Sequence, residues 1–167
     1  MAGLAGWLSR YLDVWSRFLG VWVLLALLAL GLAIATPLAA NLLLVPVLIS
    51  GIGAVTRSPV GVLRELAGTR KMLEQCMTEI IDVGRAHDVP FDPDVVERWM
   101  SFLDGIPADA TASMQRDLME GRPSELEAQN GAVVRLGQQV GVPTPLNDFI
   151  YNALLPMEQA SRGLHPA

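Results

Sequence analysis

The spacing of apolar side chains predicts helices through most of the chain after residue 57. Between residues 69 and 87, apolar or small residues recur every three or four positions and therefore share one helical face: Leu73, Cys76, Met77, Ile80, Ile81 and Gly84. Similar spacing follows in residues 93–103 and 124–140. No stretch sustains the period-two alternation of a half-buried strand. The pattern predicts an all-α fold, a helical bundle.

Short polar residues, prolines and glycines indicate where these helices begin and end. The expected starts are Thr69, Asp92 with Pro93, Ser113, Ser124, and Thr144 with Pro145. The expected ends are His87, Leu103, Gly121 and Gly141. Apolar spacing further predicts that Phe102, Leu136, Phe149 and Leu154 are available for the core.

The first 40 residues follow a different pattern. Residues 18–36 carry no charge and are long enough to cross a hydrocarbon core of about 30 Å as one helix. Trp7, Trp15 and Arg17 precede them, as is typical of a membrane interface. We expect residues 1–40 to form a separate apolar segment with a long helix. Three interpretations stay open: a membrane-embedded helix, a helix buried in a soluble core, or a stretch foreign to this domain.

Charge and cysteine content narrow the class of partner. Hydrophobic residues make up 51% of the 167 and charged residues only 17%, which excludes intrinsic disorder. Residues 57–167 contain ten Lys or Arg against sixteen Asp or Glu, so no basic surface for nucleic acid is expected. The single cysteine, Cys76, excludes an internal disulfide and suits a reducing compartment.

The common catalytic and metal-binding templates are missing from the sequence. Residues 51–53 (GIG) lack the third glycine and the preceding strand of a dinucleotide fingerprint. His87 and His165 lie too far apart to suggest a metal pair; His87 is expected at a helix C-terminus and His165 in a solvated tail. Cys76 is expected in the core, because it shares the apolar helix face.

One segment, residues 112–148, combines a hydroxyl and a carboxylate near two expected helix starts. Ser113 begins one helix and Glu125 lies in the first turn of the next, so a helical hairpin could bring them together around a small hydroxy or keto acid. The alternative from the residues alone is that Ser113 is an N-cap and Glu125 a capping or dipole residue. Asn130 next to Gly131 is unusual inside a helix unless it packs closely or bonds a neighbouring backbone.

This segment also resembles a known family. The run SMQRDLMEGRPSELEAQNGAVVRLGQQVGVPTPLNDFIYNAL is similar to the C-terminal domain of the ketopantoate reductase (2-dehydropantoate 2-reductase) family. The matching positions are Ser113, Met114, Asp117, Gly121, Arg122, Glu125, Asn130, Gly131, Gly137, Gly141, Pro145 and Asn147. Weaker similarity extends the resemblance to about residues 50–160, and we expect residues 41–167 to form the family's helical domain.

The resemblance implies a function and a site. Family members reduce ketopantoate to pantoate with NADPH, in the cytoplasm, at a site between a Rossmann domain and this helical domain. Carried over by position, Ser113 is the substrate-binding serine, and Glu125 is the carboxylate that orders the substrate and the catalytic lysine. The implied partners are a Rossmann domain or a second copy of the chain, with a small keto acid as ligand.

The departures from the family matter equally. The Rossmann half and its NADPH site are absent from this sequence. Residues 41–42 hold no lysine where the family has its general acid, Lys71 lies too far along, and Ala110 stands near the place of a family asparagine. We therefore expect a substrate-binding and dimerisation domain that is inactive alone. The alternative is a non-catalytic helical interaction module tethered to a membrane through residues 18–36.

Overall fold

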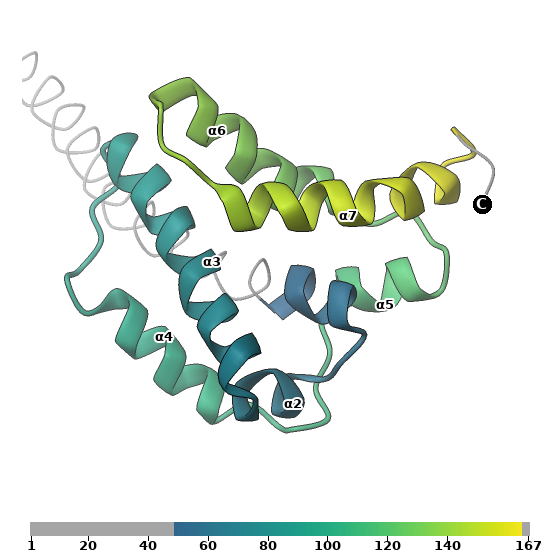
Figure 1. Cartoon of the computed structure of the whole chain (residues 1–167), viewed down its shortest axis with the longest axis horizontal. Helices are drawn as coiled ribbons and strands as arrows, with labels where there is room; N and C mark the ends of the chain where they lie inside the picture. The colour runs from purple at the N-terminus through teal and green to yellow at the C-terminus, as the bar shows by residue number, and fades with distance from the viewer. Residues whose placement is uncertain (1–48, 165–167) are drawn as a thin grey trace, which may run out of the picture. The chain divides into compact units, whose positions relative to one another are not determined.

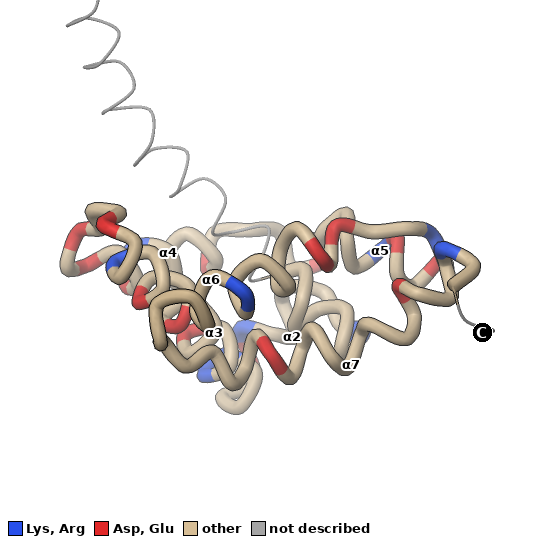
Figure 2. Tube along the Cα trace, turned by 90° about the horizontal axis from the view of Figure 1, so that it is seen from above, with Lys and Arg blue, Asp and Glu red and all other residues tan. Residues whose placement is uncertain are grey.

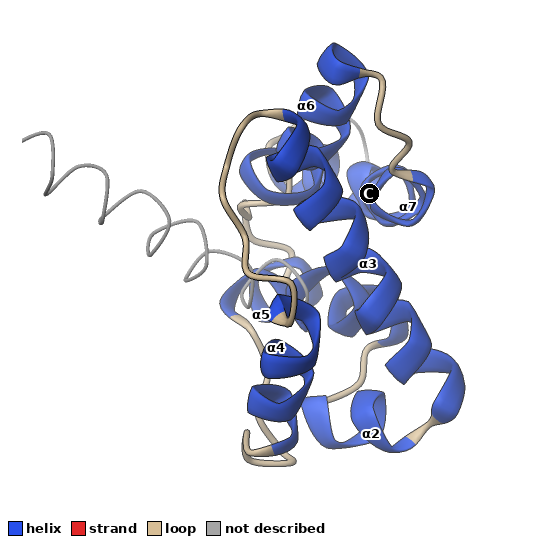
Figure 3. Cartoon of the chain, turned by 90° about the vertical axis from the view of Figure 1, so that its left-hand side faces the viewer, coloured by secondary structure: helices blue, strands red, loops and turns tan. Residues whose placement is uncertain are grey.

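The structure, a computed structural model, describes residues 49–164 (Figure 1). The elements are a helical stretch at 49–56, α2 Val60–Glu65, α3 Ala67–Ala86, α4 Val95–Asp104, α5 Ser113–Met119, the π-helix η1 Glu127–Gly131, α6 Ala132–Val140 and α7 Pro145–Ser161. Figure 3 shows helices joined by loops, without a strand in the described part of the chain. The all-α prediction is confirmed.

Three predictions concern residues that the structure does not describe. The apolar segment 1–40, its long helix at 18–36 and the position of His165 all lie outside residues 49–164. Within the described range, every helix is too short or too polar to cross a bilayer. The proposed boundary at residue 40 therefore stays a prediction.

The long helix α3 is the centre of the described bundle. It packs against α2 near its start, against α4 along one side, and against α6 and α7 along the other (Figure 1). Helix α5 lies below α7 and contacts it. This arrangement places the segment that contains Ser113 and Glu125 beside α7.

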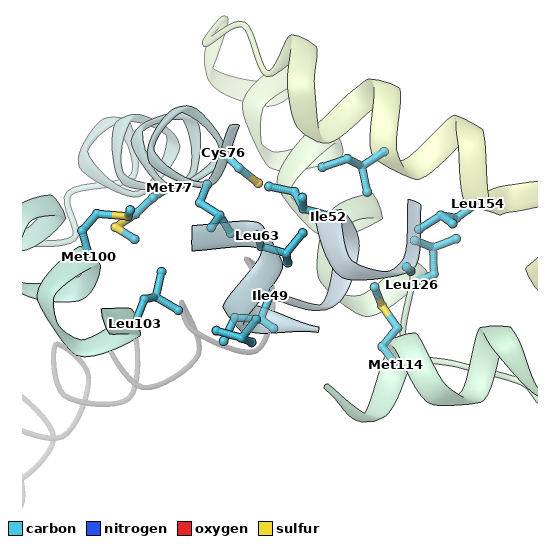
Figure 4. Packing of buried hydrophobic residues seen from close by; sticks show 14 of the residues in the cluster. Ile49, Ile52, Leu63, Cys76, Met77, Met100, Leu103, Met114, Leu126 and Leu154 are labelled. Carbon is cyan, nitrogen blue, oxygen red and sulfur yellow. The ribbon is translucent and has the colours of Figure 1, made fainter. Parts of the chain in front are cut away.

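Apolar residues from all these elements meet in one core. Figure 4 shows Ile52, Leu63, Cys76 and Met77 in its middle, with Met114, Leu126 and Leu154 gathered at one end. The predicted burial of Cys76 and Leu154 is confirmed, since both are almost inaccessible to solvent. Burial of about 25 cal/mol per Å² of apolar surface is the main stabilising contribution in such a core.

The GIG sequence is used for close helix packing. Residues 51–53 lie in the helical stretch 49–56 and are buried. A Cβ atom at Gly51 would lie 2.8 Å from Cγ2 of Ile150, and one at Gly53 would overlap the side-chain amide of Gln115. Since nothing larger than glycine fits at either position without a shift, these two residues let the helix approach α7 and α5.

Two expected helix starts are wrong. Helix α3 begins at Ala67, and Thr69 lies in its first turn, where its hydroxyl donates to the backbone oxygens of Leu63 (2.6 Å) and Leu66 (3.1 Å). The hydroxyl therefore links α3 to the end of α2. Helix α4 begins at Val95 after Asp94, because the carboxylate of Asp92 pairs with Arg98 instead of capping the helix.

The predicted helix 124–140 is not continuous. Residues before 127 form a turn, Glu127–Gly131 is a π-helix, and α6 follows from Ala132 to Val140. Asn130 occupies this π-helix and is fully buried, and the hydrogen bond from its Nδ2 to Oδ1 of Asn147 offsets part of the cost of burying the amide. The predicted ends are confirmed: Gly141 has φ of 71° in the left-handed region, and Gly121 has φ of 69° just after α5. The start of α7 at Pro145, after Thr144, is also confirmed.

Three large apolar side chains expected in the core lie at the surface. Phe102, Leu136 and Phe149 are exposed, with Phe149 at 55%. None of the three belongs to the buried positions of its helix. Phe102 instead packs edge-on against Trp99 on α4, with ring centroids 5.5 Å apart.

Charged side chains of both signs are interspersed along the described trace (Figure 2). Several form surface pairs, of which Arg70 and Asp104 make the best-aligned one, a bidentate contact at 2.6 and 2.9 Å. The hydrogen bonds from Arg70 lower the pKa of the Asp104 carboxyl. Such exposed pairs contribute little to stability and leave the core to decide the fold.

Candidate functional site

Ser113 is the first residue of α5, and its side chain is exposed. The N-cap position belongs to Ala112, which makes no side-chain capping bond, so the expectation that Ser113 caps this helix is wrong. The backbone of Ala112 is extended, so Ala112 occupies the N-cap position. Ser113 is then the first helical residue, one position too late to act as the cap. The hydroxyl of Ser113 makes no hydrogen bond within the described residues and is available to a ligand.

Glu125 is exposed in the turn just before η1. Its carboxylate Oε2 accepts a hydrogen bond from Nε2 of Gln129 at 2.8 Å, and its backbone oxygen accepts one from the Gln129 amide at 2.9 Å. The prediction that it lies in the first turn of a regular α-helix is wrong, because the π-helix intervenes. One side of the carboxylate is held by Gln129, and the rest is open to solvent.

The residues that follow these two side chains anchor them to the same part of the core. Met114 comes directly after Ser113, Leu126 comes directly after Glu125, and both are completely buried. Figure 4 shows Met114 and Leu126 together with Leu154 of α7. The structure thus brings together the anchors of Ser113 and Glu125, although no hydrogen bond in the described residues joins the two side chains themselves.

The connection between the two is a tight turn held by Arg122. Its backbone amide donates to the Asp117 oxygen at 2.8 Å, and its guanidinium donates twice to the Asp117 carboxylate, at 2.7 and 2.9 Å. Arg122 also pairs with Glu120. Together with the left-handed Gly121, these bonds reverse the chain between α5 and Ser124. The turn fixes the start of the connection between the two candidate residues.

A buried polar cluster joins α3, η1 and the start of α7. Oδ1 of Asn147 accepts hydrogen bonds from Nδ2 of Asn130 (3.1 Å) and from the thiol of Cys76 (3.3 Å). Nδ2 of Asn147 donates to Glu79 at 2.8 Å. The carboxylate of Glu79 also accepts from the backbone amides of Leu146 (2.9 Å) and Asn147 (3.0 Å), the first free donors of α7.

This cluster settles the role of Cys76. Burial, and after it the negative charge of Glu79, raise the pKa of the thiol to about 12. The group is therefore neutral in the folded protein and a poor nucleophile. The prediction that Cys76 is a core residue, not a catalytic one, is confirmed.

Sequence reasoning missed the buried acids. Glu79 and Glu158 are both nearly inaccessible to solvent, and neither of them is singled out in the sequence analysis. The only signal in the sequence is spacing: Glu79 lies three residues after Cys76, and Glu158 lies four after Leu154. Among the remaining candidates, His87 is confirmed as the C-cap of α3, and Lys71 is exposed on the same helix.

A comparison with protein families decides the relationship. The model described as "Ketopantoate reductase PanE/ApbA C terminal" matches residues 39–158. The chain belongs to the ketopantoate reductase family. Its match is to the helical C-terminal domain, as the sequence resemblance predicts.

Individual relatives of the family agree. A 2-dehydropantoate 2-reductase from Aquifex aeolicus is 33% identical over 103 residues, which cover 59% of this chain and 33% of that protein. One from Caulobacter vibrioides is 26% identical over 99 residues, 59% of this chain and 34% of its own. The chain therefore spans about a third of the length of these curated relatives.

Solved structures similar to this chain have the same helical fold. A dimeric ketopantoate reductase from Staphylococcus aureus superposes with a TM-score of 0.69 at 27% identity, over 73% of this chain and 43% of that one. A D-mandelate dehydrogenase with NADH and anilino(oxo)acetate has a TM-score of 0.65 at 24% identity, which establishes a common fold.

The described residues do not fit a dinucleotide. The Rossmann fold holds a nicotinamide cofactor at the turn between a strand and a helix, and residues 49–164 contain no strand. Gly51 and Gly53 have the spacing of part of a dinucleotide fingerprint, but they are packed against the side chains of Ile150 and Gln115. Residues 49–164 also contain no cluster of three side chains suited to a metal ion.

Proposed function

We propose that residues 41–167 are the substrate-binding and dimerisation domain of a ketopantoate reductase-like protein. The family reaction is the NADPH-dependent reduction of 2-dehydropantoate to pantoate. The observation that carries this proposal is the exposed pair Ser113 and Glu125 in one segment of the family's domain, each followed by a fully buried residue. Rigid backbone under exposed polar groups is what a binding site requires.

The two side chains have complementary roles in the proposed site. The Ser113 hydroxyl can donate a hydrogen bond to the carboxylate of the keto acid. The Glu125 carboxylate can accept one from the substrate hydroxyl, and in the family it also orders the catalytic lysine. Because this chain has no lysine at residues 41–42, we assign Glu125 a binding role and a catalytic role that depends on an acid supplied from elsewhere.

The proposed site is incomplete without a second component. Hydride transfer needs the nicotinamide held against the carbonyl carbon, and the protein must provide that position. We propose that a Rossmann domain supplies the NADPH site, with a second copy of this chain as a further partner. A cytoplasmic location fits this cofactor and the single buried thiol. Residues 1–40 are proposed to be a segment separate from this domain.

Ligand binding tests the proposal directly. We expect the full chain to bind ketopantoate in calorimetric titration, and Ser113→Ala or Glu125→Gln to weaken binding about tenfold, the effect of one hydrogen bond to a charged group. Matched controls are Ser101→Ala and Glu97→Gln, which change exposed residues on α4. Absence of binding, or equal affinity in all four variants, would refute the proposed site.

A second measurement tests whether this chain needs a separate NADPH-binding domain for the reaction. The isolated chain is expected to leave NADPH unoxidised when ketopantoate is present. If it oxidised NADPH at a rate that Ser113→Ala or Glu125→Gln abolished, the chain would be a complete reductase and our assignment would be wrong.

A further inference from the structure

All three polar groups of Ser124 are bound by Glu158 of α7 or by Arg162, the residue that follows this helix. The backbone amide donates to Oε2 of Glu158 at 3.0 Å, and the hydroxyl donates to the same oxygen at 2.5 Å. The backbone oxygen accepts from Nη2 of Arg162 at 3.0 Å. Glu158 and Arg162 are themselves paired, since Nε of Arg162 donates to Oε1 of Glu158 at 2.6 Å.

These groups are largely buried, so the contacts between them matter energetically. Ser124 is buried, and the Glu158 side chain is only 5% exposed, whereas that of Arg162 is 47% exposed. A buried carboxylate is costly unless it is paired and hydrogen-bonded, and Glu158 has both kinds of partner here. Replacing a buried ion pair by apolar side chains of similar volume is often neutral or stabilising, so we attribute a directional role to these contacts.

The contacts fix the backbone on both sides of Glu125. The peptide group before it is held through the Ser124 oxygen by Arg162. The peptide group after it is held through the Leu126 amide, which donates to the Ser124 hydroxyl at 3.2 Å, and Leu126 is itself in the core. Glu125 is thus an exposed residue between two anchored peptide units.

We propose that Glu158 and Arg162 are positioning residues, which act through Ser124 to set the orientation of the Glu125 carboxylate. That this orientation serves a keto acid rests on the proposed function. The hold on Glu125 itself does not, and it can be measured without any ligand.

Removal of the Arg162 guanidinium is the sharpest test. In the full chain, Arg162→Met removes the donor to Ser124 at a half-exposed position, and Arg162→Lys keeps the charge. Arg98→Met, an exposed ion-paired arginine on α4, is the matched control. Ser124→Ala removes the shared hydroxyl, with Ser161→Ala as its control, because the Ser161 hydroxyl bonds only within α7.

Two readouts separate positioning from stability. Amide hydrogen exchange by NMR is expected to rise about tenfold at Leu126 in Arg162→Met, but to stay unchanged at Asn147, whose amide is held by Glu79 at the other end of α7. The ketopantoate dissociation constant is expected to rise about tenfold in Arg162→Met, with partial recovery in Arg162→Lys. The control variants should match the unmodified chain in both.

Each outcome decides the matter. Unchanged exchange at Leu126 in both Arg162→Met and Ser124→Ala would overturn the proposal, as would an equal rise at Leu126 and Asn147, which marks a general loss of stability. Faster exchange with an unchanged dissociation constant would also overturn it. If the unmodified chain binds no ketopantoate, the proposed function fails, and the hold on Glu125 is then judged by exchange and by the ¹³C signal of its labelled carboxylate.

Discussion

The two ends of α7 are both tied by buried carboxylates, but in opposite senses. At the N-terminal end the acid, Glu79, comes from α3 and accepts the backbone amides of Leu146 and Asn147. At the C-terminal end the acid, Glu158, belongs to α7 and accepts donors from Ser124 and Arg162. One end receives a cap from the bundle, and the other provides an anchor to the turn before Glu125.

This difference indicates separate roles for the two ends of α7. Thr144 at the N-cap of α7 makes no side-chain capping bond, and Pro145 has no amide hydrogen, so Glu79 serves the fold by satisfying the next two donors. Glu158 makes its contacts outside its own helix, next to an exposed carboxylate. We therefore expect changes at the first end to alter stability and changes at the second to alter binding.

The largest expected effect concerns the reactivity of Cys76 at the Glu79 end. The pKa of its thiol rises from 9.0 to about 12 in the folded protein, so the thiolate fraction at neutral pH falls about a thousandfold relative to an unfolded chain. We expect iodoacetamide to label the folded chain at least that much more slowly than the urea-unfolded chain. As the only cysteine, Cys76 reports without interference.

The same shift predicts a pH dependence of stability. Because the folded pKa is raised above the unfolded one, the contribution of the neutral thiol is complete below pH 9.0 and is lost as the pH rises toward about 12. Cys76→Ala should reduce the alkaline loss of stability measured by urea unfolding.

Equal labelling rates of Cys76 by iodoacetamide in the folded and unfolded chains would contradict the first prediction, because they would show that this end of α7 is open to solvent.

The middle of α7 should give the next largest effect. Leu154 is buried together with Met114 and Leu126 at one end of the core, so Leu154→Ala is expected to lower the free energy of unfolding by about 2–5 kcal/mol. Leu136→Ala is the control, because Leu136 is 41% exposed on α6. Urea unfolding of the full chain measures both. A neutral Leu154→Ala would mean that α7 does not pack as described.

The cap supplied by Glu79 is expected to be worth less than this apolar contact. Glu79→Gln keeps the shape but replaces one acceptor oxygen with an NH₂ donor, which leaves a buried amide of α7 without its partner. We expect a loss of about 1–3 kcal/mol in the free energy of unfolding. Glu74→Gln changes an exposed acid on the same helix and should have little effect. Equal losses in the two variants would remove the contrast between the ends of α7.

The sequence predicts the local part of this structure well. Spacing and turn residues identify α3, α4, α5 and α7, and Gly121 and Pro145 mark the end of α5 and the start of α7 through their own backbone preferences. The family resemblance likewise depends on residues within one segment. These features need only neighbouring positions to be interpreted.

What the sequence misses depends on tertiary contacts. The π-helix at Glu127–Gly131 lets Asn130 reach Asn147 on another helix, and no local pattern announces that bond. Thr69 looks like an N-cap, but its hydroxyl bonds α2 instead. For the same reason Ser113 and Glu125 could be named as candidates, whereas Glu158 and Arg162, which contact the turn from α7, could not.

The smallest expected effect on stability is at Glu125 itself. Its carboxylate is exposed and makes one side-chain hydrogen bond, to Gln129, so Glu125→Ala should change the free energy of unfolding by less than about 1 kcal/mol. Ketopantoate binding should nevertheless fall. Urea unfolding and calorimetric titration of the same sample separate the two effects, with Glu97→Ala on α4 as the control.

The opposite pattern at Glu125 would reverse our view of the C-terminal end of α7. A loss of several kcal/mol would make Glu125 a structural anchor, and the contacts of Glu158 and Arg162 with Ser124 would then support the fold, as Glu79 does at the other end. A small loss with weakened binding is expected instead, because the anchors of this turn are Ser124 and Leu126, both buried, while the side chain between them points to solvent.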